Sequence, residues 1–225
     1  TAKEFDVPAS GTMAHSFIEA YDSELEAFMD YAKYYPNNCI LLVDTYDTLN
    51  SGVVNAIKTF KHMKENGIST DHIGIRIDSG DLAYLSKEAR KMLDEAGFEN
   101  ATICLSNSLN AQTIESLVQQ GAKFDSIGVG DNISKPEGRL GAVYKLVAVY
   151  KDNQEVPKIK LSNDVIKIVN PGHKKLYRAY DKNTGYAIAD VMSRIDEEIN
   201  QRDLTIVSLN GYKKSSVLED YELIP

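Results

Sequence analysis

Short apolar runs alternate with stretches of helical periodicity over the first 130 residues of this 225-residue chain, and this alternation constrains the fold more than any other feature. Four apolar runs of strand length lie at residues 39–44, 72–78, 101–106 and 126–130. Apolar residues recur at helical spacing in the stretches that precede and separate them, at residues 13–35, 48–66, 82–96 and 110–120. A strand, a helix and a second strand in succession form the crossover that joins parallel strands. The sequence therefore predicts an α/β fold with a parallel sheet.

The spacing of the predicted strand ends leaves two architectures open. The ends at Asp44, Asp78, Ser106 and Gly128 are 34, 28 and 22 residues apart, and each interval accommodates one right-handed crossover. Four such units make up half of a (β/α)8 barrel or most of an open, doubly wound sheet.

The pattern changes after residue 141. Apolar and polar residues alternate more strictly there, KDN and DKNTG are hairpin signals, and strands are expected at residues 142–150, 174–181, 186–193 and 204–209. We therefore expect an α/β domain over residues 1–141, followed by a mostly antiparallel β segment over residues 142–225.

Polar residues follow every predicted parallel strand at the point where the strand ends. They are Asp44, Thr45 and Asp47; Arg76, Asp78, Ser79 and Asp81; Ser106, Asn107, Ser108 and Asn110; and Gly128, Gly130, Asp131 and Asn132. The carboxyl ends of parallel strands meet at one edge, where α/β proteins hold their ligands. Helix capping is the alternative explanation for Asp47 or Thr48, Ser79 and Asn110. Because four successive strands end in this way, we predict a ligand site at this edge.

The residue types at this edge suit a phosphorylated sugar. Gly128 and Gly130 would let backbone N–H groups approach a phosphate, although a tight turn explains the same pair. Ser106 and Asn107 would add neutral donors. A carboxylate at Asp78 suits ribose hydroxyl groups or Mg²⁺. Arg76 lies on the same side of its strand as Asp78, so it either pairs with that carboxylate or reaches an anionic ligand.

His15 is a candidate nucleophile or base in the segment ASGTMAHSF. It falls in the first turn of a predicted helix, where the helix dipole disfavours the imidazolium form and leaves a neutral imidazole. A capping or packing role is the alternative for such a histidine. His62, His72 and His173 have no comparable surroundings and are expected to be surface or packing residues.

Composition narrows the classes of partner. The formal net charge of −8 argues against a broad surface for nucleic acid or for an anionic membrane. Cys39 and Cys104 lie in apolar runs and are expected to be reduced core thiols, without a disulfide framework or zinc spacing. With neither a membrane-length apolar run nor a signal peptide, a cytoplasmic setting is expected.

Six motifs together resemble the nicotinate phosphoribosyltransferase family. In chain order they are GTMAHSFI, LLVDTYDT, GIRIDSGDL, SNSLN, GVGDN and RAYDKNTGYAIADVM. They run from about residue 10 to residue 193, and their combination is specific where AHSF or DSGD alone would not be. The resemblance implies a type II phosphoribosyltransferase, with part of an irregular (β/α) barrel followed by the antiparallel segment.

The resemblance also implies a reaction in NAD biosynthesis. Nicotinate and 5-phosphoribosyl 1-pyrophosphate would give nicotinate mononucleotide and pyrophosphate, with Mg²⁺ as cofactor and ATP as a hydrolysed co-substrate. The family is about twice as long as this chain, and its active site is shared across a homodimer. This chain alone is therefore expected to hold half a site and to be inactive.

Roles carry over to individual residues by the same resemblance. His15 would be phosphorylated by ATP, and Asp78 would be the second catalytic residue, placed at the ribose. Arg76 would face the base, and Gly128 and Gly130 would hold the 5-phosphate. Ser106 and Asn107 would lie beside that phosphate, Asp44 would complete the substrate-binding set, and no residue is assigned as a metal ligand.

Three alternatives remain open. The first is a related enzyme that uses nicotinamide or quinolinate as its base. The second is a metal-dependent lyase with Asp44, Asp78 and Asp131 as ligands. The third is a non-catalytic fragment that serves as an oligomerisation module.

Overall fold

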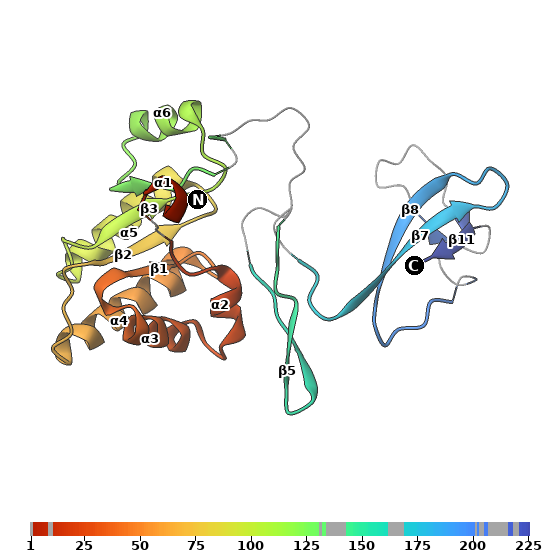
Figure 1. The fold of residues 1–225 in the computed structure, drawn as a ribbon, viewed down its shortest axis with the longest axis horizontal. Coiled ribbons are helices and arrows are strands. Elements are labelled where there is room, and N and C mark those ends of the chain that lie inside the picture. Colours follow the sequence, from red (N-terminus) through yellow and green to blue (C-terminus); the bar gives the residue numbers. More distant parts are fainter. Residues whose placement is uncertain are drawn as a thin grey trace. The chain divides into compact units, whose positions relative to one another are not determined.

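The computed structural model describes residues 2–8, 11–130, 132–133, 143–161, 169–200, 202, 205–206, 216–217 and 221–225. The chain divides into two compact units (Figure 1). The first comprises Thr1–Leu146 and Lys158–Asn170, and the second comprises Val147–Pro157 and Pro171–Pro225. The chain thus leaves the first unit, enters the second and returns once before the second unit is completed.

A four-stranded parallel sheet forms the centre of the first unit. Its strands are β1 (Cys39–Leu42), β2 (Ile73–Ile77), β3 (Thr102–Leu105) and β4 (Ser126–Ile127). They lie in the order β1-β2-β3-β4, so each strand pairs with its neighbour in sequence. The four predicted parallel strands are confirmed, each about two or three residues shorter than predicted. The order shows none of the reversal that defines a doubly wound sheet.

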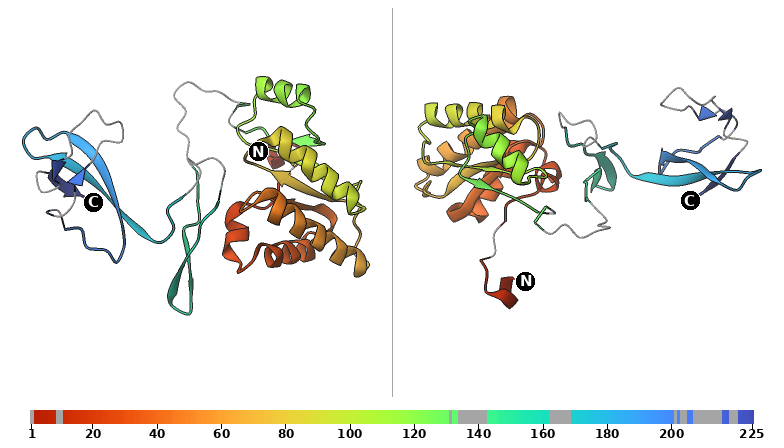
Figure 2. Two further views of the ribbon diagram at one scale, coloured as in Figure 1. Left: turned by 180° about the vertical axis from the view of Figure 1, so that it is seen from behind. Right: turned by 90° about the horizontal axis from the view of Figure 1, so that it is seen from above.

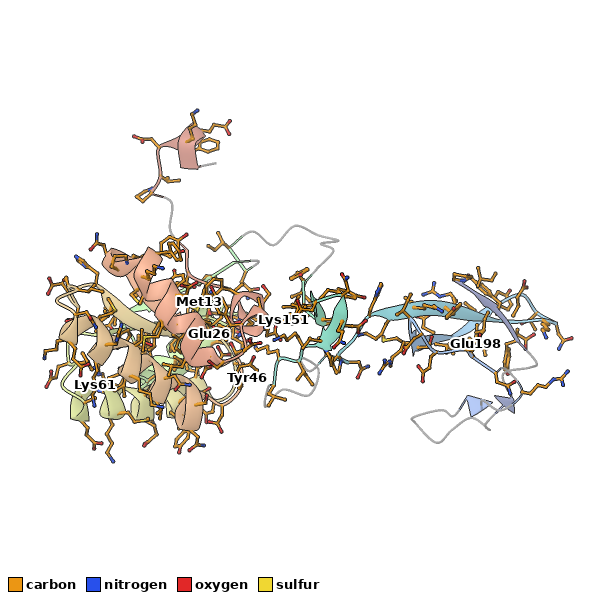
Figure 3. The ribbon with its side chains drawn as sticks, turned by 90° about the horizontal axis from the view of Figure 1, so that it is seen from below. Met13, Glu26, Tyr46, Lys61, Lys151 and Glu198 are labelled. Carbon is orange, nitrogen blue, oxygen red and sulfur yellow. The ribbon has the colours of Figure 1, made fainter. Side chains whose placement is uncertain are left out.

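Helices cover one face of this sheet in a single layer. They are α3 (Glu24–Tyr34), α4 (Val53–Glu65) and α5 (Leu82–Glu95), with α6 (Ala111–Gln119) between β3 and β4 in the chain. Helix α3 packs on α4 and β1, α4 packs on β2 and α5, and α5 packs on β2 and β3. The view from behind in Figure 2 has this layer in front of the strands. Charged side chains such as Glu26 and Lys61 project outward from it (Figure 3).

Alternation along the strands divides the sheet into a core face and an open face. In β2, the side chains of Ile73, Ile75 and Ile77 are fully buried towards the helix layer. Gly74 and Arg76 occupy the alternate positions and therefore face the other way. Since parallel partners share a face, the open side of the sheet is the side that carries Arg76.

Two predicted helices begin differently from the expectation. The stretch 13–35 is not one helix: α2 (His15–Ala20) ends before Ser23, whose hydroxyl accepts a hydrogen bond from the Glu26 N–H and caps α3. The stretch 48–66 opens with one π-helical turn, η2 (Thr48–Gly52), before α4 begins. The remaining short helices are α1 (Ala2–Phe5) and the 3-10 turn η1 (Pro36–Asn38).

The second unit is antiparallel, as predicted. Strands β5 (Ala148–Lys151) and β6 (Gln154–Pro157) form a hairpin. Its turn holds Asp152 and Asn153 at φ 50° and 62°, the left-handed pair that a tight hairpin turn requires. Strands β7 (Lys174–Asp181) and β8 (Ala187–Arg194) form the second predicted hairpin, and β11 (Tyr221–Ile224) pairs with the other edge of β7.

Some strand predictions in this unit need correction. The run at 142–150 forms a strand only from Ala148 onward, residues 143–147 are not strand, and residue 142 lies outside the described part. The run at 204–209 is described only as β9 (Thr205–Ile206), which pairs with β10 (Ser216–Val217). Strands β6, β10 and β11 were not predicted. Across the described part of the chain, no helix has the length and apolar character needed to cross a membrane.

Candidate active site

The register of the sheet places four predicted site residues in one row. Leu42 pairs with Arg76, Arg76 with Cys104, and Cys104 with Ser126. Two residues further along each strand, on the same face, come Asp44, Asp78, Ser106 and Gly128. Backbone hydrogen bonds continue the ladder to this point, from the Ser106 N–H to the Ile77 carbonyl at 3.0 Å and from the Gly128 N–H to the Leu105 carbonyl at 2.8 Å.

A cavity of about 1010 Å³ opens above this row, within the first unit. Most of its wall comes from the strand ends and from the segment before α2. The wall includes Gly11, Thr12, His15, Arg76, Asp78, Cys104, Ser106, Asn107, Ser108, Gly128, Gly130, Lys145 and Lys160. Three of these residues are cations and one is a carboxylate, so the cavity suits an anionic ligand.

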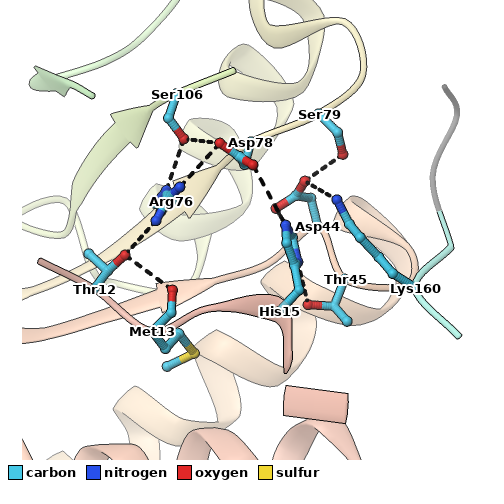
Figure 4. A network of polar contacts seen from close by, with 10 residues as sticks. All are labelled: Thr12, Met13, His15, Asp44, Thr45, Arg76, Asp78, Ser79, Ser106 and Lys160. Carbon is cyan, nitrogen blue, oxygen red and sulfur yellow. Dashed lines mark hydrogen bonds and ion pairs between the residues drawn. The ribbon is translucent and has the colours of Figure 1, made fainter. Parts of the chain in front are cut away.

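Arg76 and Asp78 form a fixed network on the wall of the cavity (Figure 4). The Arg76 NH2 group donates to Asp78 Oδ1 at 3.2 Å, its Nε donates to Ser106 Oγ at 2.9 Å, and its NH1 group donates to Thr12 Oγ1 at 2.8 Å. The Ser106 hydroxyl in turn donates to Asp78 Oδ1. Arg76 therefore pairs with Asp78. Because a guanidinium has five N–H donors, it also keeps two N–H groups beyond these three bonds.

The ionised form of Asp78 is strongly favoured. Burial acts to raise the pKa of this carboxyl, but the hydrogen bonds from Ser106 and Arg76 and the charge of Arg76 outweigh burial and hold the pKa far below its ordinary value of 3.8. Asp78 is therefore a permanent negative charge at the cavity wall at neutral pH.

His15, the first residue of α2, is held between two carboxylates. Its Nδ1 lies 3.0 Å from Thr45 Oγ1. Its Nε2 lies 3.7 Å from Asp78 Oδ2 and 4.0 Å from Asp44 Oδ1, and it has no hydrogen-bond partner among the described residues. One ring nitrogen is thus anchored, and the other is directed towards Asp78 at the cavity and Asp44 behind it.

Asp44 occupies a different place from the predicted substrate ligand. It is 3% exposed and is not part of the wall of the large cavity; it lines a smaller hollow of about 140 Å³. Its Oδ2 accepts a hydrogen bond from Ser79 and lies 3.7 Å from Lys160 Nζ. Asp44 therefore reaches the cavity indirectly, through His15.

Lys160 is a site residue that the sequence analysis missed. It follows β6 in the chain and is 2% exposed, and the segment that carries it is fixed by a 3.0 Å bond from Lys158 Nζ to the Tyr21 carbonyl. A 3.1 Å bond from the Leu161 N–H to the Thr45 carbonyl fixes the same segment. The only local signal was a lysine in an apolar and polar alternation, which is equally typical of a surface strand.

Asn107 and Ser108 hold an unusual backbone conformation at the end of β3. Their φ angles are 114° and 50°, in a region that residues with a side chain rarely adopt. Both residues line the cavity. Such local strain is typical of functional sites.

Gly128 and Gly130 also lie on the cavity wall, but they differ in the space around them and in the bonding of their backbone. The Gly128 N–H is used within the sheet, so it is not the phosphate donor that the glycine pair suggested. A side chain at Gly128 would place its Cβ 3.3 Å from the Cβ of Ser106, while at Gly130 no atom lies within 4 Å. Gly128 therefore contributes room above Ser106, and Gly130 leaves the backbone open to a ligand.

Three of the polar residues after the strands are helix caps. Asp47 caps η2, Asp81 caps α5 through the Tyr84 N–H at 3.0 Å, and Asn110 caps α6 in a capping box. Ser79, which was a candidate cap, instead donates to Asp44. Capping thus explains part of the polar cluster but none of the residues around His15.

Two further predictions concern the metal ligands of a lyase and the burial of the two cysteines. Among the described residues, no group of three or more His, Cys, Asp or Glu is arranged to hold a metal ion, and Asp131 lies outside them. The ligand set of the metal-dependent lyase, which includes Asp131, is therefore only partly covered by the described residues. Cys39 is a buried thiol whose pKa is raised to about 12 by burial, as expected for a core residue. Cys104 is half-buried and lines the cavity, so its assignment to the core was wrong.

The parallel sheet with its strand ends around one cavity belongs to a fold known from solved phosphoribosyltransferases. A crystal structure of nicotinate phosphoribosyltransferase from Porphyromonas gingivalis superposes with a TM-score of 0.58 at 22% identity, covering 75% of this chain and 46% of that chain. A second, from Vibrio cholerae, gives a TM-score of 0.53 at 17% identity, covering 75% and 42%.

The chain itself belongs to the nicotinate phosphoribosyltransferase (NAPRTase) family, whose model matches residues 1–182. It is 46% identical over 202 residues to the nicotinate phosphoribosyltransferase of Bacillus subtilis (strain 168), covering 89% of this chain and 40% of that protein. The chain therefore spans about two fifths of the length of that curated relative.

Proposed function

We propose that the protein containing this chain is a nicotinate phosphoribosyltransferase, which forms nicotinate mononucleotide and pyrophosphate from nicotinate and 5-phosphoribosyl 1-pyrophosphate. The observation that carries the proposal is the meeting of His15, Arg76 and Asp78 at one cavity. They come from three separate parts of the sequence, and their roles in the family require them to act on one substrate set.

The charges of the cavity suit these substrates. Arg76 keeps two N–H donors and presents a planar cation to a planar, anionic base such as nicotinate. Lys145 adds positive charge for phosphate groups. Asp78 is ionised and fixed by Arg76 and Ser106, so it can accept hydrogen bonds from ribose hydroxyl groups.

The transfer step follows from this arrangement. The C–O bond from the anomeric carbon to pyrophosphate breaks, the ring carries oxocarbenium character, and the nicotinate nitrogen forms the new C–N bond. Asp78, a fixed anion next to the sugar, stabilises that positive charge. The pyrophosphate leaves with the electron pair of the broken bond.

ATP coupling through His15 is consistent with the orientation of its ring. With the Nδ1 proton donated to Thr45, the Nε2 lone pair attacks the γ-phosphorus of ATP; an N–P bond forms, and the bond to the ADP oxygen breaks. Hydrolysis of the phosphohistidine returns inorganic phosphate. We therefore assign phosphorylation to Nε2.

Mg²⁺ is proposed to bind through substrate oxygens. The described residues hold no cluster of three metal-ligating side chains, and Mg²⁺ commonly binds to phosphate groups with few protein ligands. When bound, it neutralises charge on the pyrophosphate and on the ATP phosphates.

The finer architecture is part of the same proposal. The sequential order of β1 to β4 is the order that strands take in a (β/α) barrel, so we infer that the sheet is part of an irregular barrel. A homodimer that completes the site is proposed from the family. The free thiols of Cys39 and Cys104 support a cytoplasmic setting.

Labelling of the full-length protein with [γ-³²P]ATP tests the proposal. We expect acid-labile label at His15 in the wild type and none in His15→Ala, and acid-labile label retained in His15→Ala would remove His15 from the mechanism. Assays with nicotinate, nicotinamide and quinolinate separate the proposed activity from its relatives. Absence of product with all three bases would leave the oligomerisation module as the explanation.

A further inference from the structure

His15 lies between two carboxylate groups, those of Asp78 and Asp44, that make the same pattern of contacts. Each carboxylate directs one oxygen at His15 Nε2: Asp78 Oδ2 lies at 3.7 Å and Asp44 Oδ1 at 4.0 Å. The other oxygen of each accepts a hydrogen bond from a serine, Ser106 for Asp78 and Ser79 for Asp44. The two carboxylates thus approach the same nitrogen from the ends of neighbouring strands.

Each of the two carboxylates is paired with a cation on the side that faces away from His15. Arg76 NH2 lies 3.2 Å from Asp78 Oδ1, and Lys160 Nζ lies 3.7 Å from Asp44 Oδ2. Arg76 belongs to the predicted site. Lys160 does not, although it takes the equivalent place beside Asp44 and is more deeply buried than Arg76.

The charge on these carboxylates decides what His15 can do. Two uncompensated anions beside Nε2 favour a proton on that nitrogen, and a protonated Nε2 has no lone pair with which to attack phosphorus. Arg76 and Lys160 each offset one anion. The groups that face the His15 ring are Thr45 and Asp44 after β1 and Asp78 after β2, with Arg76 and Lys160 behind the two carboxylates and Glu19 on the same helix.

Glu19 is a second buried carboxyl group on which the charge of Lys160 acts. It is 1% exposed, and burial raises its pKa while Lys160, Lys145 and Lys158 act to lower it. Lys160 thus pairs with Asp44 and also acts electrostatically on Glu19. Its positive charge at Asp44 cannot be replaced by solvent, because all three side chains are excluded from water.

We propose that Lys160 is a positioning residue for His15: it offsets the charge of Asp44 and so keeps His15 Nε2 unprotonated and nucleophilic. This inference rests on the proposed function only for the identity of the phosphoryl donor. The state of the His15 ring is a property of the protein and can be measured without a substrate.

The test measures acylation of His15 by diethyl pyrocarbonate, which reacts with neutral imidazole, in the full-length protein at pH 7. Rates are taken by peptide mass spectrometry, with the exposed His72 as internal reference. We expect the His15 rate to fall about three- to tenfold in Lys160→Met, because removal of the cation leaves a proton on Nε2. Lys158→Met is the matched control: Lys158 anchors the same segment but does not contact Asp44 in the described structure, so the His15 rate should be unchanged.

Rescue separates a charge effect from a packing effect. In an Asp44→Asn background Lys160 no longer offsets a carboxylate charge beside His15 Nε2, so adding Lys160→Met should leave the His15 rate unchanged. This comparison also serves if Lys160→Met alone fails to fold, as a buried unpaired carboxylate can cause. The proposal would be overturned if Lys160→Met caused the same loss of reactivity in the wild-type and Asp44→Asn backgrounds, or if a folded Lys160→Met reacted at the wild-type rate.

Labelling with [γ-³²P]ATP on the same variants distinguishes the two proposals. If the acylation pattern holds but the wild type takes up no phosphate, the proposed function fails and the role of Lys160 stands. If the wild type is labelled at His15 and Lys160→Met is labelled at the same rate, the role of Lys160 fails and the function stands.

Discussion

Ser106 links Arg76 to Asp78 through a single hydroxyl group, which accepts from Arg76 Nε at 2.9 Å and donates to Asp78 Oδ1. The serine ends one strand, and the ion pair that it joins lies on the neighbouring strand. The network therefore holds the strand ends together and at the same time sets the orientation of two groups that face the cavity.

Substitution Ser106→Ala should loosen this network without removing either charge. A half-buried carboxylate and a half-buried guanidinium each lose one hydrogen bond, so we expect a loss of about 1–3 kcal/mol in the free energy of unfolding and weaker binding of the phosphosugar. Urea unfolding and calorimetric binding on the full-length protein measure the two effects. Ser116→Ala, at an exposed serine on α6, is the control and should change neither.

Substitution Asp78→Ala should abolish most phosphosugar binding while the fold remains. Asp78 is the carboxylate on the cavity wall, and its side chain lies at the end of the sheet rather than in the helix-facing core. We expect at least about a tenfold increase in the dissociation constant for 5-phosphoribosyl 1-pyrophosphate, equivalent to about 1.4 kcal/mol. An unchanged dissociation constant in a variant with a native circular dichroism spectrum would contradict the role of Asp78.

The pH dependence of the unfolding free energy should reflect the lowered pKa of Asp78. Its pKa in the folded protein is held below the ordinary value of 3.8, so the native state binds this proton less readily than the unfolded state. The stabilisation from the ionised carboxylate is complete above about pH 5 and is lost only as the pH falls through the folded pKa. The difference in unfolding free energy between wild type and Asp78→Asn should therefore be constant from about pH 5 to 8 and shrink below about pH 4. A difference that already shrinks near pH 6 would be inconsistent with the depressed pKa.

Glu24 should affect the pH dependence of the unfolding free energy in the direction opposite to that of Asp78. Burial raises its pKa above the ordinary value of 4.5, although Ser51 and Asn55 donate to its Oε2 at 2.5 and 2.9 Å and act to lower it. The native state therefore binds the proton more tightly, and the stability that Glu24 contributes is lost as the pH rises through the folded pKa. Relative to wild type, Glu24→Gln should gain stability between about pH 5 and 8, measured by thermal unfolding across that range. Glu26→Gln, at an exposed position on the same helix, should show no such trend.

Gly52 should tolerate no side chain. A Cβ at this position would lie 1.9 Å from the Val43 carbonyl oxygen and 2.6 Å from its carbon, and backbone atoms cannot rotate away. We expect Gly52→Ala to lower the unfolding free energy by about 3 kcal/mol or more. Gly11→Ala should lower it far less, because no atom lies within 4 Å of the corresponding Cβ. Comparable stability of the two variants would show that the close approach of η2 to Val43, the residue after β1, is not required.

The parts of the fold set by local patterns were predictable. Apolar runs such as 72–78 and the helical spacing of the stretches between them predicted the parallel strands and their crossovers, because each unit lies within one short stretch of chain. The row of site residues also followed from the sequence, since parallel strands end at one edge. The break before α3 was missed although Ser23 and Glu26 have the spacing of a capping motif.

The parts that depend on distant contacts were not predictable. Lys160 comes 116 residues after Asp44 and belongs to a segment whose local pattern is that of a β strand. That segment is held by bonds from its neighbours Leu161 to Thr45 and Lys158 to Tyr21, which no local pattern encodes. For the same reason the sequence could not show that Ser79 binds Asp44 while Asp81 caps α5, since both serine and aspartate are common caps.

The hairpin of β5 and β6 interrupts the first unit between Leu146 and Lys158. A protease cut at the exposed Asp152–Asn153 turn would therefore put His15 and Lys160 on different polypeptides while breaking no bond near either one. Two fragments divided at that turn and expressed separately make a complementation pair. His15 and Lys160 come together only when the fragments reassemble. The reactivity of the His15 imidazole would therefore measure that assembly.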